Sequence, residues 1–218
     1  FDGTNWTSTT NYVGSIWSIA TDSSGAIFAA ASGVGVGAPF VKVVGTTIEA
    51  VSTGAPAADT NIAVTMPNGD VVLGGSFTAI EGVSANNIVR WDGTSYHALG
   101  LGVDGAVTSL TIDADGNLLA GGSFTNAGGS PAARIARWNG TAWSAIGTGL
   151  SGSPRFLACN GSGEIVAILS NPTTNFVVTY DGQNWSAQTQ PGTISGLIAL
   201  PNNDFVIAGS LQQTQLPL

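Results

Sequence analysis

The chain has 218 residues, of which only 8% are charged, and a formal net charge of −8; globular domains average about 25% charged residues. A hydrophobic content of 43% excludes intrinsic disorder. Five Lys and Arg residues are too few for a protein that binds nucleic acid through its phosphates. No apolar run reaches the ~18 residues of a membrane-spanning helix. The chain starts at Phe1 rather than Met, so we expect a processed product or a piece of a longer chain.

A short motif recurs along the chain: an aromatic residue, Asp or Asn, Gly, two further residues and a second aromatic residue. Copies begin at Phe1, Trp91, Trp138 and Tyr180, and a degraded copy begins at Val43. The motif glycines, 42 to 48 residues apart, are Gly3, Gly45, Gly93, Gly140 and Gly182. Between them lies a second series of turn residues, each followed seven positions later by Ser: Gly25, Gly69, Gly116, Gly163 and Asn203. Units of 40–48 residues are typical of β-propeller blades.

Each repeat predicts four short strands joined by tight turns. In the clearest copy we expect strands at 107–112, 117–123, 134–138 and 141–146, because Asp-Gly and Asn-Gly pairs favour hairpin turns. In chain order, the repeats are 14–53, 60–100, 106–147, 154–189, and 194–218 completed by 1–9. The prediction is an all-β fold, a single β-propeller domain over 1–218 with four-stranded antiparallel blades. We expect five blades, with a fragment of a larger propeller as the alternative.

Two sequence segments carry a resemblance to a known class of repeat. They are Arg-Trp-Asn-Gly-Thr-Ala-Trp at 137–143 and Gly-Gly-Ser-Phe-Thr at 74–78 and 121–125. The sequence there resembles the β-propeller repeats of secreted bacterial proteins, phage structural proteins and fungal cortical polarity markers. The resemblance implies an adhesive or structural role at an extracellular or virion surface. The motif turn is also similar to the Asp-box of sialidases, but it lacks the Ser or Thr two residues before the Asp.

Few residues are candidates for catalysis or metal binding. His97 is the sole histidine and falls on a predicted outermost strand, so we interpret it as a surface residue. Cys159 falls on a predicted innermost strand, far from any activating cation, and is interpreted as a buried structural thiol. Asp104, Asp113 and Asp115 lack the regular spacing and downstream Glu of a calcium loop. We therefore expect turn stabilisation there, no metal and no cofactor.

Equivalent positions of the repeat carry large aromatic and basic side chains. Packing between neighbouring sheets is the favoured role of the aromatic position, and a row of sugar-binding sites is the alternative. Its residues are Trp6, Tyr96, Trp143 and Trp185, with Ile48 in the weak copy. Arg90 and Arg137 share another position. We expect them to pair with Asp on adjacent blades, or else to line an anion pocket.

The longer connections gather at one end of the predicted blades, where binding residues concentrate in rigid scaffolds. They cover 79–87, 99–106, 126–133 and 147–155, and they are rich in Gly, Ser and Ala. Such loops suit contacts with other structural proteins or with a neutral surface glycan. The sequence thus predicts a non-enzymatic interaction or adhesion module, extracellular or on a virion. The alternative is a lectin with sites between blades that use the aromatic residues above together with Arg90 and Arg137. A hydrolase is the third and weakest hypothesis.

Overall fold

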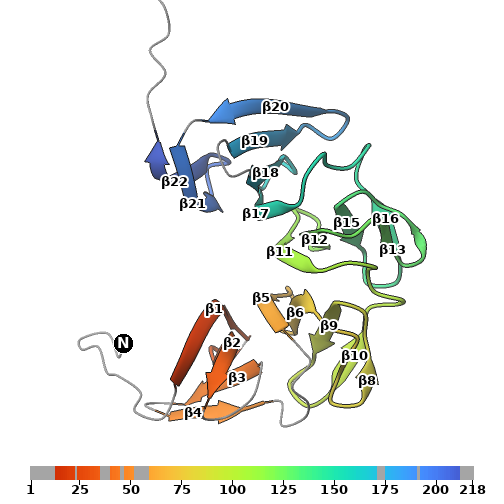
Figure 1. Cartoon of the computed structure of the whole chain (residues 1–218), viewed down its shortest axis with the longest axis vertical. Coiled ribbons are helices and arrows are strands. Elements are labelled where there is room, and N and C mark those ends of the chain that lie inside the picture. Colours follow the sequence, from red (N-terminus) through yellow and green to blue (C-terminus); the bar gives the residue numbers. More distant parts are fainter. Residues whose placement is uncertain are drawn as a thin grey trace, which may run out of the picture. The chain divides into compact units, whose positions relative to one another are not determined.

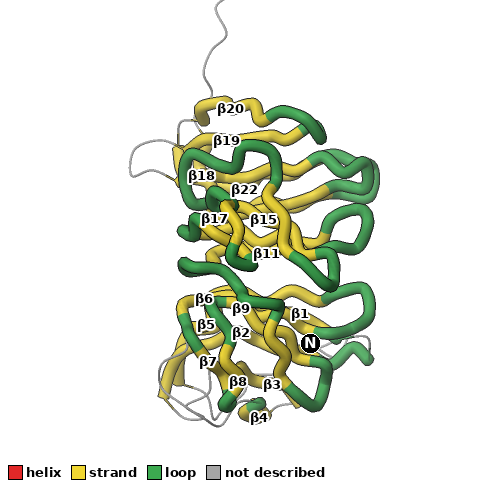
Figure 2. Tube along the Cα trace, turned by 90° about the vertical axis from the view of Figure 1, so that its right-hand side faces the viewer, coloured by secondary structure: helices red, strands yellow, loops and turns green. Residues whose placement is uncertain are grey.

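The computed structural model describes residues 13–22, 24–34, 40–44, 47–51, 59–170, 175–190 and 192–211. The regular elements within these ranges are all β-strands (Figures 1 and 2). Across the same ranges there is no helix with the length and apolar character needed to span a membrane. The chain divides into two compact units, Phe1–Gly102 and Val103–Leu218.

The first unit contains two four-stranded antiparallel sheets, which we call the first and second blades. The first blade has the strand order β1 (Val13–Thr21), β2 (Ile27–Val34), β3 (Phe40–Val44) and β4 (Thr47–Ala50). The second blade has the order β5 (Asp59–Thr65), β6 (Val71–Ser76), β9 (Ile88–Trp91) and β10 (Tyr96–Ala98). A small hairpin, β7 (Ala79–Ile80) with β8 (Val83–Ser84), interrupts the second blade between β6 and β9.

The second unit contains the third and fourth blades and a two-stranded sheet. The third blade has the order β11 (Val107–Ile112), β12 (Leu118–Gly122), β15 (Ile135–Trp138) and β16 (Trp143–Ala145), with a hairpin of β13 (Asn126–Ala127) and β14 (Ser130–Pro131) before β15. The fourth has the order β17 (Pro154–Cys159), β18 (Ile165–Ser170), β19 (Asn175–Tyr180) and β20 (Trp185–Gln190). The two-stranded sheet pairs β21 (Gly192–Ala199) with β22 (Phe205–Leu211).

These sheets confirm the predicted fold class, because four-stranded antiparallel meanders are the blades of a β-propeller. The strands expected at 107–112, 117–123, 134–138 and 141–146 are all present, and the last of them is shorter than expected. The two-stranded sheet supplies two strands of a fifth repeat. Its predicted completion by residues 1–9 lies outside the described residues.

All five repeats share an irregularity in their first strand. The pairing register with the second strand shifts in β1, β5, β11, β17 and β21. In the third blade the shift lies opposite the Gly121–Gly122 pair. A Cβ at Gly122 would collide with the carbonyl oxygen of Ala106, so the backbones approach as closely as glycine permits. The Gly-Gly of the recurring segment is thus a packing requirement.

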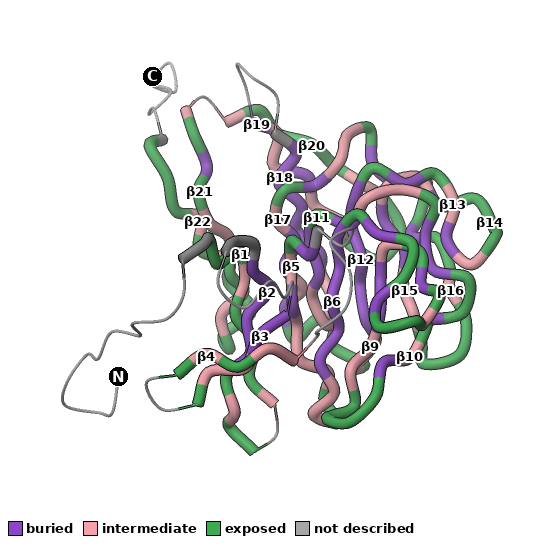
Figure 3. Tube along the Cα trace, turned by 60° about the horizontal axis from the view of Figure 1, so that its bottom comes forward, coloured by how far each residue is buried: buried purple, intermediate pink, exposed green. Residues whose placement is uncertain are grey.

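The core lies along the second strand of each blade, as the buried segments of Figure 3 show. Each residue from Val71 to Gly75 in β6 and from Leu118 to Gly122 in β12 is buried, so both faces of these strands are covered. Within the first unit one apolar cluster joins Phe28 and Phe40 of the first blade to Leu73 of the second. Within the second unit another joins the third and fourth blades. Burial on both faces accounts for much of the low charge.

Candidate functional site

The recurring Asp or Asn of the motif closes the turn between the third and fourth strands. In the second blade, Asp92 Oδ1 accepts hydrogen bonds from the Thr94 and Ser95 amides, each at 2.9 Å, and from the Thr94 hydroxyl at 2.8 Å. Asn139 in the third blade makes the same three contacts, and Asp181 in the fourth accepts two amides. Turn geometry therefore explains the Asp or Asn at this position. The other residues that contact the turn differ between blades.

In the second, third and fourth blades the two aromatic residues of the motif stand opposite one another on the third and fourth strands. Ring centroids are 4.8 Å apart for Trp91 with Tyr96, and 5.4 and 4.8 Å apart in the next two blades. Tyr96 is buried in the core of the first unit, and Trp185 donates a hydrogen bond of 3.2 Å to the Ile146 carbonyl. These contacts fit the packing interpretation; sugar binding at Tyr96, Trp143 and Trp185 stays a prediction, and Trp6 lies outside the described residues.

Arg90 and Arg137 pair with carboxylates of their own blades, which corrects the expectation that they reach adjacent blades. Arg90 contacts Asp70, and Arg137 Nε lies 2.8 Å from Asp113 Oδ2. Both acids belong to the turn between the first and second strands, but at different positions of it. The two arginines are therefore neutralised by carboxylates that come from different positions of the equivalent turn.

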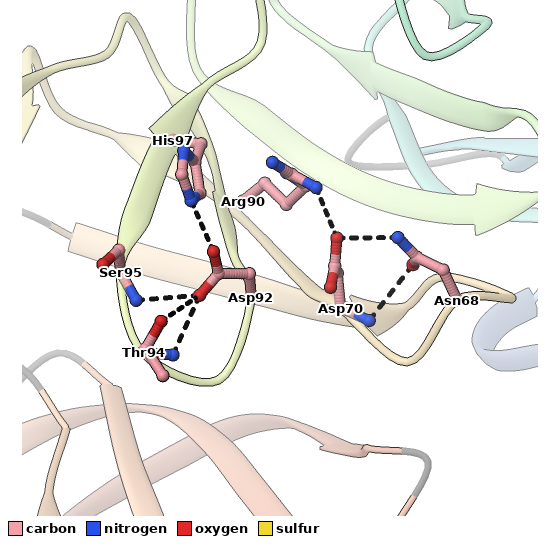
Figure 4. Close-up of polar contacts among 7 residues, drawn as sticks. All are labelled: Asn68, Asp70, Arg90, Asp92, Thr94, Ser95 and His97. Atoms are coloured by element: carbon pink, nitrogen blue, oxygen red, sulfur yellow. Dashed lines mark hydrogen bonds and ion pairs between the residues drawn. The ribbon is translucent and has the colours of Figure 1, made fainter.

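The seven polar residues drawn in Figure 4 gather at the turn end of the second blade. His97 Nε2 lies 2.6 Å from Asp92 Oδ2, and Asn68 Nδ2 donates to Asp70 Oδ2 at 2.8 Å. Hydrogen bonds from the Ser95 and Thr94 amides, together with His97, hold the pKa of Asp92 well below its ordinary value. The single histidine is thus a partly exposed partner of a fixed carboxylate, at the place on β10 where the sequence predicted a surface residue.

The remaining candidates do not form a common centre. Cys159 is half-buried on β17, and burial raises the pKa of its thiol, which disfavours a reactive thiolate. Asp113 binds the Asp115 and Asn117 amides of its own turn. Among the described residues no group of three or more His, Cys, Asp or Glu side chains is placed to hold a metal ion.

Asp104 has a role of its own at the start of the third blade. Its carboxylate accepts the amides of Thr125 and Asn126 at 2.7 and 2.8 Å, and both of their side chains at 2.9 and 2.6 Å. Burial acts to raise the pKa of Asp104, but the hydrogen bonds from Asn126 and Thr125 outweigh it and lower the pKa to about 2. The carboxylate fixes the base of the β13–β14 hairpin.

Two cavities flank Trp91 within the first unit. The smaller one, of about 100 Å³, lies at the turn end and is lined by Asp22, Asp70 and Asp92 among others. The larger one has a volume of about 370 Å³. Its lining residues are Val51, Glu81, Val83, Trp91, Thr94, Ser95 and Tyr96. Within the described part of the chain, the buried indole N–H of Trp91 has no hydrogen-bond acceptor.

Sequence reasoning named Tyr96 as a candidate sugar-binding residue but did not single out Glu81, which lines the same cavity. Glu81 sits at the tip of the β7–β8 hairpin with a φ of 49°, a left-handed conformation that side chains with a Cβ seldom adopt. The matching position of the third blade is Gly128, with a φ of 59°. Comparing the two nearly identical repeats position by position is the signal that could have found it.

Comparison with known proteins agrees with this architecture. A gluconolactonase from Xanthomonas campestris is 16% identical, with a TM-score of 0.58 over 88% of this chain and 68% of that one. A virginiamycin B lyase from Staphylococcus aureus is 10% identical, with a TM-score of 0.62 over 97% and 73%. YCF48 bound to a D1 peptide is 15% identical, with a TM-score of 0.54 over 90% and 61%. No curated protein sequence matches the chain.

These neighbours correct one expectation from the sequence. We expected a protein that is not an enzyme, because no catalytic constellation stood out; that prediction is contradicted, since enzymes are among the structures this chain resembles. The likeness extends to the fold alone, and a fold does not specify a function. A family model, described as the Rax2 C-terminal beta propeller domain, matches residues 49–204. The chain therefore belongs to the Rax2 C-terminal β-propeller family.

Proposed function

We propose that this chain is an interaction or adhesion module of an extracellular or virion-surface assembly, which contacts its partners through the β7–β8 and β13–β14 hairpins. The observation that carries the proposal is that both hairpins are fixed in place although their tips are exposed. Loops held rigidly before binding lose little conformational entropy when a partner docks. Both hairpins interrupt their blades at the connection between the second and third strands.

Matching hydrogen bonds anchor the two hairpins at their bases. In the second blade the Ala85 amide donates to the Thr78 carbonyl at 3.0 Å, and the Asn87 amide to that of Phe77 at 2.8 Å. The third blade repeats both bonds through Ala132 and Arg134. Phe77 and Phe124, at the start of each hairpin, are buried. This apolar anchor and backbone ladder support a rigid projection from each blade.

The composition of the hairpins favours a neutral partner surface. Across residues 78–86 and 125–133, Glu81 is the sole ionisable side chain. Desolvation of charged groups is the costliest part of forming a polar interface. Docking through these hairpins desolvates few charges. The resemblance to repeats of secreted and phage structural proteins supports the same setting.

Site-specific crosslinking in the intact cells or particles that produce the protein tests the proposal. A photoreactive residue replaces Ser84 or Ser130 on the hairpins, and Thr141 or Gln183 on tight turns serves as the control; all four are exposed. We expect the two hairpin positions to capture the same structural protein and the two turn positions to capture none. Equal capture at all four positions would contradict the proposal. So would an antibody against the chain that fails to label intact cells or particles.

Carbohydrate binding is the second candidate function. The observation that favours it is the cavity of about 370 Å³, because Tyr96, one of the predicted sugar-binding residues, lines it together with Trp91. Val51 follows β4 of the first blade and the other lining residues belong to the second, so the cavity lies between blades, as a lectin site of this kind requires.

A further inference from the structure

The larger cavity of the first unit combines the features of a small-molecule site. Its volume of about 370 Å³ lies at the small end of the range of roughly 300–1,000 Å³ for such sites. Trp91 and Tyr96 are its aromatic residues, and Thr94, Ser95 and Glu81 are its polar ones. Among the described residues that line it there is neither Lys nor Arg.

The two aromatic residues that line the cavity are in contact with each other. Trp91 and Tyr96 pack against each other, with their centroids 4.8 Å apart and their planes 48° apart. A cage for a quaternary ammonium ion needs aromatic faces that enclose the cation from several sides. Two rings in mutual contact do not enclose a cation, whereas the apolar C–H face of a sugar ring can pack against an aromatic face.

Glu81 is present at a backbone position where the equivalent repeat uses glycine. Its φ of 49° is unfavourable for a residue with a Cβ, whereas Gly128 adopts a φ of 59° without penalty. A non-glycine residue kept in this conformation, at the wall of a cavity, points to a function of its side chain. A carboxylate there can accept two hydrogen bonds from neighbouring hydroxyls, and bonds to a charged acceptor are stronger than neutral ones.

We infer that the cavity lined by Glu81, Trp91 and Tyr96 binds a neutral sugar of mono- or disaccharide size. The inference rests on the second candidate function and specifies its ligand class. The negative charge of Glu81 disfavours anionic sugars. Vicinal hydroxyls of the sugar donate to Glu81, Thr94 and Ser95 line the same space, and the sugar ring packs against Trp91 and Tyr96.

The third blade differs from the second at the position of Glu81. Gly128 offers no side chain, and a Cβ there would lie 3.1 Å from the Cβ of Trp143, so that tryptophan packs directly on the hairpin backbone. The indole of Trp143 therefore lies against the hairpin backbone, at the position that Tyr96 occupies in the second blade. We expect a single sugar site in these two blades and not a row of equivalent sites.

Isothermal titration of the whole chain tests the inference with glucose, galactose, mannose, N-acetylglucosamine and their disaccharides. N-acetylneuraminic acid serves as the anionic probe and choline as the cationic probe. We expect at least one neutral sugar to bind and both charged probes to fail. Glu81→Gln and Glu81→Gly should each weaken that binding by roughly 10- to 100-fold, which is the effect of losing a hydrogen bond to a charged group.

Glu81→Gly also separates binding from folding, because glycine relieves the positive φ and the variant should melt no lower than the parent chain. Asn203→Gly is the matched control: its φ is 69°, four other repeats have glycine in that turn, and its sugar affinity should be unchanged. The inference is overturned if no neutral sugar binds at roughly 10 mM, if choline or the acidic sugar binds instead, or if Glu81→Gly binds as the parent does. Crosslinking at Ser84 and Ser130 would still report separately on the protein contact.

Discussion

The second and third blades are built from nearly the same sequence and differ in what surrounds their shared skeleton. Both have a buried Phe before the hairpin, a glycine pair on the second strand, an aromatic pair and an arginine on the third strand. The skeleton recurs because each blade must bury both faces of its sheet. Differences from one blade to the other therefore identify positions that the fold leaves free.

Four such differences separate the blades. The arginines pair with acids at different turn positions. The Asp92–His97 pair of the second blade corresponds to Asn139 and Ser144 in the third. The hairpin base is held by the Asn87 amide side chain in the second blade and by Asp104 in the third. Glu81 and Tyr96 stand where the third blade has Gly128 and Trp143. The last difference opens a cavity, so it is the one that bears on function.

The largest expected effect tests the shared skeleton. Phe77→Ala and Phe124→Ala should each lower the free energy of unfolding by about 3–5 kcal/mol, because both rings are almost fully buried. Urea unfolding measures the loss. Leu101→Ala, at a side chain 69% exposed, should stay within about 0.5 kcal/mol of the parent. Clearly unequal losses at the two phenylalanines would mean that the hairpins are not equivalent.

The glycine pair should show a smaller loss. Gly122→Ala forces a Cβ against the Ala106 carbonyl and should cost about 1–3 kcal/mol in urea unfolding. Gly75→Ala, at the same register opposite Thr60, should cost about as much if the two blades share this contact. Gly152→Ala is the control, because its nearest neighbour lies 3.8 Å away in ordinary contact. A Gly122→Ala variant as stable as that control would refute the packing explanation.

The arginines should distinguish the blades. Arg137→Gln leaves the carboxylate of Asp113, 3% exposed, without its cation and should cost about 1–3 kcal/mol at neutral pH. Arg90→Gln should cost less, because Asp70 is 12% exposed and so is better solvated when it loses its cation. Adding Asp113→Asn to Arg137→Gln should recover part of the loss in a double-mutant cycle. A larger loss at Arg90 would reverse the expected order.

The smallest effect is a local pH dependence at the base of the β13–β14 hairpin. Because folding lowers the pKa of Asp104 from 3.8 to about 2, its stabilising effect is complete above about pH 4 and disappears as the pH falls through 2. Amide protection of Thr125 and Asn126 should decline over that interval in the parent chain, and Asp104→Asn should remove the dependence. The Phe77 amide, bound to Asn87 Oδ1 at 3.1 Å, is the internal control. An equal decline at Phe77 would count against a local cause.

Much of the fold was predictable from the sequence, because the sequence pattern of one blade recurs several times along the chain. The Asp-Gly and Asn-Gly turns, the order of strands and the alternation of buried residues are local consequences of chain chemistry. The partners of Arg90 and Arg137 were not predictable, because Asp70 follows its turn glycine whereas Asp113 precedes its own by three residues. Only a folded turn shows that both carboxylates reach the same end of the sheet.

The sequence by itself determined an all-β chain of repeated four-stranded units, since turn residues and apolar runs act within a few positions of one another. Tertiary structure decided which of the recurring positions border empty space. The aromatic position of the motif is aromatic in the second, third and fourth blades, yet Tyr96 borders a cavity while Trp143 packs on a glycine. That outcome depends on which residues of other segments, such as Val51, Glu81 and Gly128, lie beside the aromatic ring, and the local sequence pattern does not specify them.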